Sequence, residues 1–428
     1  MARLHLIIIL FFFFFSAAFA TGKPHAFMMK VSKHDFGYLY YSSIEVGTAQ
    51  NSFSVNLVLD LSSKSQFPWF DCSATRYNSS SYRPFRFGSP GCKLVKNAVP
   101  WDCPNAIGAP PTSFCFNQSC GVFPISDVEI VYIGSLGEDI MRLGSRFTTP
   151  PVVFSCVNPS TAGTVPESSP GILSLSRHVL SLPMQLASSL QLPRKFALCL
   201  PSNTNQEPGR GSLFIGGGPY LYPPYSGDAS GLFATTSFVT NPAIKARHKG
   251  ASPGDYFVDV RSIEVDGETI RFDKSILSVD KKGKGGTTFD ITRPYTYMRS
   301  SIFNPFIKAF KAKARARKMI ETTTYAPYSA CFDRKSVRTG IAGPDVPAID
   351  LVLRDGKKWR IYGSNLMVDD GESWCLTVQG GSGVRPAILI GGILVENNLM
   401  EFDIESSKFS VTSSLLLHNT SCTRSATA

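Results

Sequence analysis

The 428-residue chain lacks several features that would assign it to large classes of proteins. It contains no CxxC pair, and its six histidines are scattered without ligand spacing, so we expect no metal site. Long heptad repeats are absent, which excludes an extended coiled coil. Beyond the N-terminus no apolar run is long enough to cross a membrane, and no motif calls for a cofactor.

The one strongly apolar segment lies at the N-terminus. Arg3 precedes an apolar run from Leu6 to Ser16, and Ala18-Phe19-Ala20 has the small-x-small pattern of a signal-peptide cleavage site. A membrane anchor is the alternative, but the run is short for a bilayer and ends in small residues. We therefore expect residues 1–20 to be a signal peptide and the mature protein to be secreted, extracellular or bound to the cell wall.

The ten cysteines agree with an oxidising compartment and predict five disulfides. Six of them lie between positions 72 and 156, so we expect the first half to be the more heavily cross-linked. Three sequons permit N-glycosylation, at Asn78, Asn117 and Asn419. These features together predict a disulfide-bonded glycoprotein.

Positive charge exceeds negative charge, with a net charge of +11 for the whole chain. A basic secreted protein is expected to meet polyanions such as acidic cell-wall polysaccharide, and not nucleic acid. The densest basic run lies at Lys308 to Lys318, and apolar residues at helical spacing in and before it predict an amphipathic helix. Its cationic face has two interpretations, a solvated surface and a polyanion-binding surface.

Most of the remaining apolar pattern consists of short runs separated by turn residues, which predicts an all-β protein with a few short helices such as 182–190. We expect strands, among others, at 39–46, 53–61, 128–133, 152–156, 196–200, 212–215, 257–265, 349–353, 387–390 and 399–404.

A weak internal repeat relates the two halves of the chain. Asp60 ends an apolar run, and Ile172-Leu173-Ser174 follows about a hundred residues later. Asp290 likewise ends a run, and Leu389-Ile390-Gly391 follows at a similar distance. This pattern predicts two homologous lobes, 21–201 and 202–428, each placing one acid at a shared cleft. The segment 201–210, rich in Asn, Pro and Gly, is the expected linker.

The segments Asp60-Leu61-Ser62-Ser63 and Asp290-Ile291-Thr292-Arg293 look like aspartic-protease signatures, Asp-Thr/Ser-Gly-Thr/Ser, in which little but the acid is kept. With these and several further segments, nearly the whole mature chain resembles the plant xylanase-inhibitor-like and basic-globulin-like branch of the pepsin-like aspartic proteases. The resemblance implies a bilobal fold with a central cleft. It also implies disulfides between Cys331 and Cys375 and between Cys199 and Cys422. The further segments are 196–202, 212–219, 285–296, 346–353, 359–367, 390–392, 402–403 and 413–417.

The resemblance identifies Asp60 and Asp290 as the positions of the catalytic dyad, but the residues around them differ from those of working enzymes. Leu61 and Ile291 replace hydroxyl residues that bond across the cleft. Ser62 and Thr292 replace the glycines that follow, and each adds a Cβ that is expected to fit poorly there. Arg293 brings a cation that, facing the dyad, would favour the ionised carboxylate, whereas catalysis requires one shared proton. The resemblance also implies a flap hairpin, expected between Cys120 and Gly134, that carries a tyrosine. Tyr132 is the only candidate for this tyrosine and lies close to the end of the hairpin.

Two functional classes therefore stand, a catalytically inactive binding protein and an atypical secreted aspartic endopeptidase. In the inhibitor branch, a histidine near the last cysteine enters the active site of a microbial xylanase. His418, four residues before Cys422, matches it, and Arg293 occupies the position of a second, apolar contact. The implied partner is a microbial glycoside hydrolase of xylanase type. The alternative interpretation of His418 is that it is an ordinary exposed loop residue. A third interpretation of the protein is a basic cell-wall or storage globulin.

Overall fold

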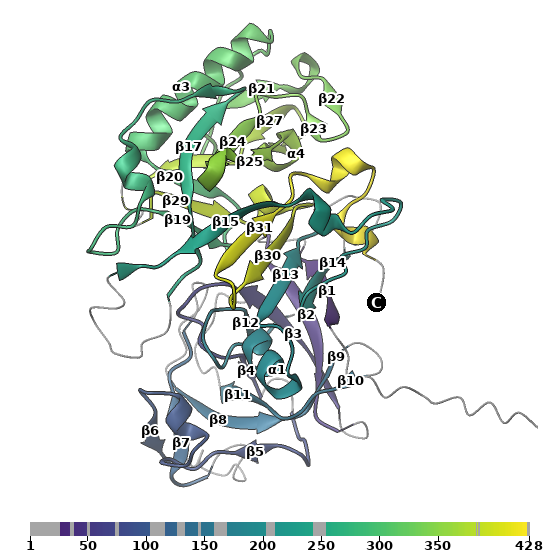
Figure 1. The fold of residues 1–428 in the computed structure, drawn as a ribbon, viewed down its shortest axis with the longest axis vertical. Helices are drawn as coiled ribbons and strands as arrows, with labels where there is room; N and C mark the ends of the chain where they lie inside the picture. Colours follow the sequence, from purple (N-terminus) through teal and green to yellow (C-terminus); the bar gives the residue numbers. More distant parts are fainter. Residues whose placement is uncertain are drawn as a thin grey trace, which may run out of the picture.

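The computed structural model describes residues 26–34, 38–48, 52–72, 77–102, 116–125, 133–143, 147–157, 169–202, 210–242, 254–381, 383 and 386–425. The expected signal peptide, Cys103, Cys115 and the flap candidate Tyr132 lie outside these residues. Two β-rich lobes lie at opposite ends of the molecule, with a sheet between them (Figure 1). The predicted fold class, an all-β bilobal pepsin-like fold with a few short helices, is confirmed.

The first lobe is organised around the strand that ends at the first acid. The hairpin β2 (Tyr40–Val46) and β3 (Phe53–Asp60) is antiparallel, and β12 (Gly171–Ser174) pairs with β3 in parallel. Alternating buried and less buried residues along β2 explain why it is a strand with one face toward the core. The other strands of this lobe are β4 (Trp69–Asp71), β5 (Arg83–Pro84), β6 (Val99–Trp101), β7 (Ser119–Val122), β8 (Gly134–Asp139), β9 (Met141–Leu143), β10 (Phe147–Thr148) and β11 (Val152–Val157).

The central sheet takes strands from the beginning, middle and end of the chain. Neighbouring strands pair antiparallel in the order β1, β14, β13, β30, β31, β15. Because strands from both lobes share this ladder, it fixes the lobes to one another (Figure 1). The bounds are β1 (Phe27–Lys33), β13 (Lys195–Cys199), β14 (Arg210–Ile215), β15 (Ala234–Val239), β30 (Leu399–Asp403) and β31 (Lys408–Val411).

The second lobe repeats the arrangement around the second acid. Strand β19 (Thr287–Asp290) pairs in parallel with β29 (Ile388–Gly391), and β20 (Thr296–Arg299) runs antiparallel to β29. Smaller sheets and short strands complete the lobe: β16 (Phe257–Val258), β17 (Val260–Val265), β18 (Glu268–Thr269), β21 (Cys331–Asp333), β22 (Thr339–Gly340), β23 (Gly343–Pro344), β24 (Ile349–Leu353), β25 (Lys358–Ile361), β26 (Met367–Asp369), β27 (Ser373–Leu376) and β28 (Val378–Gly381).

Helices are few and lie outside the sheets. α1 (Leu182–Leu190) has the bounds that the sequence predicts, and the predicted basic helix is α3 (Ser300–Ala316). Ile302, Phe306 and Phe310 of α3 are buried against the second lobe. A short helix, α4 (Gly363–Leu366), follows β25. Among the described residues, no helix has the length and apolarity needed to cross a membrane.

Disulfides cross-link residues within both lobes and attach the C-terminal tail to the rest of the protein. Cys199 is bonded to Cys422, and Cys331 to Cys375, which are the pairs implied by the resemblance. In the first lobe Cys72 is bonded to Cys156 and Cys92 to Cys120. One extended apolar cluster runs through both lobes, from Phe27 near the N-terminus to Val411, and smaller clusters accompany it.

Candidate functional site

The first acid ends a buried strand. Asp60 is 2% exposed at the end of β3, and its register partner in β12 is Ser174. The backbone N–H of Ser62 donates to Asp60 Oδ1 at 2.8 Å, and Leu175 N–H donates to the Asp60 carbonyl at 2.8 Å. These bonds hold the carboxyl group at the carboxyl end of two parallel strands.

The second acid occupies the equivalent place in the other lobe. Asp290 is 8% exposed at the end of β19, opposite Gly391 of β29. Its Oδ1 accepts hydrogen bonds from the Thr292 hydroxyl at 2.5 Å and the Thr292 N–H at 3.2 Å. The two acids therefore end equivalent strands, each paired in parallel with the tripeptide that the internal repeat singled out.

Side chains from the beginning of the second lobe reach the loops of the first. Asp255 Oδ1 accepts a hydrogen bond from Ser63 N–H at 2.8 Å, one residue beyond the altered glycine position of the first signature. The buried Tyr256 hydroxyl donates to the Leu175 carbonyl at 2.8 Å. The first bond ties the loop that follows Asp60 to the opposite lobe, and the second ties the residue that follows β12.

The residues that replace the signature hydroxyl groups and glycines are all accommodated. Leu61 and Ile291 are 2% and 1% exposed and belong to the apolar core, so hydrophobic packing occupies the positions of the cross-cleft hydroxyl bonds. Ser62 and Thr292 are also buried. The Ser62 hydroxyl accepts from Lys64 N–H at 3.2 Å, and Thr292 uses its hydroxyl to bond Asp290.

Arg293 points at the second acid. Its Nε donates to Asp290 Oδ2 at 2.8 Å, while the Arg293 side chain is 52% exposed and the Asp290 side chain only 7%. A guanidinium at this distance stabilises the ionised carboxylate and opposes its protonation. The ion pair therefore favours a charged Asp290, whereas an aspartic dyad shares one proton between two carboxyl groups.

Behind this loop lies a buried polar cluster that sequence reasoning missed. Lys33 Nζ donates to Glu396 Oε1 at 2.5 Å, and the Tyr40 hydroxyl donates to the same oxygen at 2.6 Å. Burial raises the pKa of Glu396, against the lowering effect of Lys33, and burial also raises the pKa of Tyr40. The available signal was the alternation in β1, which places Lys33 in line with the inward-facing Phe27, Met29 and Val31.

His418 lies on the C-terminal tail, at the end of the 3-10 turn Leu415–His418, and is exposed. Its ring contacts the Tyr225 ring edge-on, with centroids 5.4 Å apart. Three interactions fix the tail. Cys422 is disulfide-bonded to Cys199, and its N–H donates to Asn397 Oδ1 at 3.1 Å. The Thr420 hydroxyl donates to the Pro223 carbonyl at 2.9 Å. The two residues expected to touch a target therefore make different contacts, Arg293 with Asp290 and His418 with Tyr225.

The three sequon asparagines, Asn78, Asn117 and Asn419, are exposed. No group of three or more metal-ligating side chains occurs in the described part of the chain.

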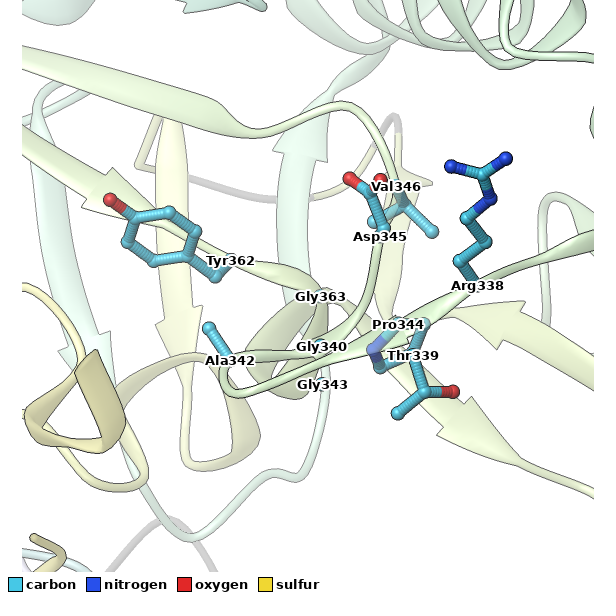
Figure 2. A pocket seen from close by; sticks show the side chains of 10 residues that line it. All are labelled: Arg338, Thr339, Gly340, Ala342, Gly343, Pro344, Asp345, Val346, Tyr362 and Gly363. Atoms are coloured by element: carbon cyan, nitrogen blue, oxygen red, sulfur yellow. The ribbon is translucent and has the colours of Figure 1, made fainter. Parts of the chain in front are cut away.

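A hollow of about 300 Å³ lies in the second lobe between the β22–β23 hairpin and the start of α4. Arg338 and Asp345 stand on one side of it and Tyr362 on the other, so its polar groups do not converge (Figure 2).

Comparisons with known proteins agree over most of the chain. Residues 40–217 match the family "Xylanase inhibitor N-terminal" and residues 255–413 match "Xylanase inhibitor C-terminal". The chain is 32% identical to "Probable aspartic proteinase GIP2" of Nicotiana benthamiana, covering 94% of this chain and 91% of that protein. It is 30% identical to "Gamma conglutin 1" of Prunus dulcis, covering 98% and 94%. The crystal structure of edgp superposes with a TM-score of 0.84 at 32% identity, covering 94% of this chain and 98% of the other.

Proposed function

The chain belongs to the xylanase-inhibitor family of pepsin-like proteins, and on this premise we propose that it is a secreted, catalytically inactive inhibitor of microbial xylanase-type hydrolases. In a plant, such a protein would act in defence, outside the cell or in its wall. The four disulfides among the described residues support an oxidising compartment.

Loss of peptidase chemistry is supported by the loops around the two acids. An aspartic dyad requires two carboxyl groups that share one proton, so that one donates while the other activates water. Here Arg293 is ion-paired with Asp290, and Leu61 and Ile291 fill the hydroxyl positions with apolar packing. The two acids then have a structural role, because each carboxylate accepts a hydrogen bond from a backbone N–H of its own loop, from Ser62 for Asp60 and from Thr292 for Asp290.

The placement of His418 is the observation that carries the inhibitory part of the proposal. Glycoside hydrolases use two carboxyl groups that flank the scissile bond. An imidazolium inserted between them would form charge-assisted hydrogen bonds and exclude the substrate. Because the disulfide at Cys422 and the Thr420–Pro223 bond fix the tail, His418 would lose little conformational entropy on binding.

Titration of microbial endo-xylanases with the purified protein tests this proposal. We expect inhibition of at least one enzyme, and at least a tenfold weaker inhibition by His418→Ala, which is the loss of about 1.4 kcal/mol of binding free energy. Arg424→Ala, which removes an exposed cation from the same tail, is the matched control and should inhibit like the wild type. Equal inhibition by His418→Ala, or no inhibition of any xylanase by folded protein, would refute the proposal.

An atypical secreted aspartic endopeptidase is the second candidate. The observation in its favour is that both acids are retained, buried and placed at the ends of equivalent strands. For this function, substrate binding would have to displace Arg293 so that the pair could hold one proton.

A further inference from the structure

The cations of α3 divide into two rows with different surroundings. The helix buries one apolar face through Ile302, Phe306 and Phe310, so its charged residues occupy the remaining surface. Two of them, Lys313 and Arg317, face the acidic turn between β17 and β18. The others lie on the stripe formed by Lys308, Lys311, Arg315 and Lys318, which we call the cationic stripe.

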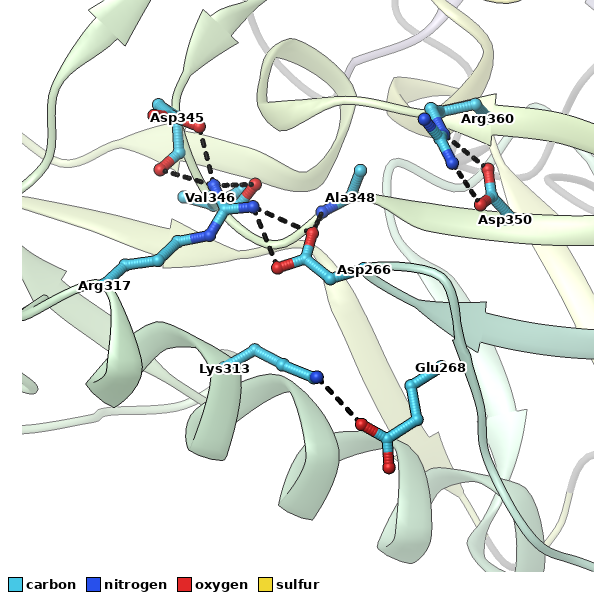
Figure 3. Close-up of polar contacts among 9 residues, drawn as sticks. All are labelled: Asp266, Glu268, Lys313, Arg317, Asp345, Val346, Ala348, Asp350 and Arg360. Atoms are coloured by element: carbon cyan, nitrogen blue, oxygen red, sulfur yellow. Dashed lines mark hydrogen bonds and ion pairs between the residues drawn. The ribbon is translucent and has the colours of Figure 1, made fainter.

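The first row is neutralised inside the protein. Lys313 Nζ lies 2.8 Å from Glu268 Oε2, and Arg317 binds Asp266 through Nη2 at 2.8 Å and Asp345 through Nη1 at 2.6 Å (Figure 3). Asp266 also accepts from Ala348 N–H at 2.9 Å. These contacts fix the C-terminal end of α3 to two loops, so this row serves the architecture of the lobe.

The cationic stripe is arranged differently. Lys308, Lys311 and Arg315 follow one another at intervals of three and four residues, which places them on one side of α3. Lys318 lies two residues beyond the end of the helix, with a left-handed φ of 62°. At 1.5 Å per residue the helical part of the stripe, from Lys308 to Arg315, is about 10 Å long. Lys308, Arg315 and Lys318 are exposed, whereas the charge of the half-buried Lys311 is already balanced by an ion pair with Glu321. The charges are therefore spread along a line and do not converge on one point.

We propose that the cationic stripe of α3 is a docking surface for a linear acidic polysaccharide, in which each sugar unit carries a carboxylate. A row of separated cations complements a chain of regularly spaced anions better than it complements a compact anion. Each contact is exposed and weak, so binding arises from several contacts at once and falls steeply with salt. The apolar face of α3 is buried in the lobe, so it cannot insert into a lipid surface as an amphipathic anchor would.

This surface is distinct from the proposed inhibitory site. The stripe belongs to α3, whereas His418 lies on the tail that is fixed to Cys199, Asn397 and Pro223. The protein could thus be held on an acidic polysaccharide while its tail remained available. The stripe accordingly adds retention at the cell wall to a function exercised elsewhere on the molecule.

Salt elution from immobilised polygalacturonate tests the inference. The stripe variant carries Lys308→Gln, Lys311→Gln, Arg315→Gln and Lys318→Gln, since glutamine keeps the helix propensity. The matched control carries four substitutions of exposed lysines on other elements, and therefore the same change in net charge: Lys30→Gln, Lys93→Gln, Lys357→Gln and Lys408→Gln. Circular dichroism and thermal unfolding establish that both variants are folded.

We expect the stripe variant to elute at roughly half the NaCl concentration needed for the control, because it releases fewer counterions on binding. The wild type should not be retained on the fully methyl-esterified polymer, which has no carboxylates. Equal elution of the two variants would mean that only net charge matters, and would overturn the inference, as would failure of the wild type to bind at low salt. Xylanase inhibition by the stripe variant should equal that of the wild type, which separates this test from that of His418.

Discussion

Arg293 Nε donates to Asp290 Oδ2 at 2.8 Å, and the Asp290 side chain is buried beneath the half-exposed guanidinium. The two residues are only three positions apart, so the pair is built into the turn that follows β19. A buried carboxylate costs free energy unless it is paired and hydrogen-bonded, and Arg293 and Thr292 supply those partners. The pair therefore stabilises the loop in the same charge state that opposes acid catalysis.

Gly392 is predicted to be intolerant of a side chain. It has an ordinary helical φ of −62°, so alanine meets no backbone strain, but its Cβ would lie 2.5 Å from Tyr40 Cε2 and 3.2 Å from the Ile291 carbonyl. Tyr40 cannot move freely because its hydroxyl is bonded to Glu396. We expect Gly392→Ala to lower the free energy of unfolding by about 1–3 kcal/mol, measured by chemical denaturation.

Gly231→Ala is the control for this substitution, since no atom lies within 4 Å of the place that the alanine Cβ would take, and Gly231 has no positive φ. It should change the free energy of unfolding by less than about 0.5 kcal/mol. Equal effects of the two substitutions would contradict the close packing of Tyr40 against the second signature loop.

The pair Lys195 and Asp403 predicts a pH dependence of stability. Burial alone would raise the pKa of Asp403, but hydrogen bonds from Ser406 and Lys195 outweigh it and hold that pKa below its usual value. A lowered carboxyl pKa gives stability that is present above the unfolded-state value and is lost as pH falls through the folded-state value. Asp403→Asn should therefore cost up to about 1 kcal/mol at pH 6, and much less at pH 3.

Denaturant unfolding at both pH values measures this difference. Glu372→Gln, at an exposed position, is the control and should alter stability equally little at pH 6 and pH 3. A cost of Asp403→Asn that is the same at both pH values would show that the loss is steric and not electrostatic.

The sequon at Asn419 provides a prediction about covalent modification. Asn419 is exposed and directly follows His418, so a glycan there would obstruct insertion of the histidine into a narrow active site. We expect mass spectrometry of the mature secreted protein to find Asn419 unmodified. Full occupancy of Asn419, together with unchanged inhibition by Asn419→Gln, would contradict the role proposed for His418.

Local patterns in the sequence predicted the fold well, because strand alternation, turn residues and helical spacing are local. The segments 182–190 and 349–353 became α1 and β24 with those bounds, and the repeat around Asp60 and Asp290 became two parallel strand pairings. The predicted basic helix was also found, but its division into a neutralised row and a stripe depends on acids far away, such as Asp345.

The site was only partly predictable for the same reason. The replaced residues could be read from the two signatures, but the direction of the Arg293 side chain depends on the folded loop. The buried cluster of Lys33, Tyr40 and Glu396 joins residues up to 363 positions apart, a separation at which no local pattern gives information. Sequence reasoning also expected Ser62 and Thr292 to fit poorly, whereas the structure uses both in hydrogen bonds.

The loss of peptidase activity is best examined by assaying the purified mature protein across acid pH, with pepstatin and Asp60→Ala as controls. No cleavage is expected, because the ion pair with Arg293 favours the ionised form of Asp290 and the hydroxyl and glycine positions of both loops are altered. We expect cleavage to require at least Leu61→Thr, Ser62→Gly, Ile291→Thr and Thr292→Gly together. Cleavage by the unmodified protein that is abolished by pepstatin and by Asp60→Ala would show instead that the two altered signatures still form a working dyad.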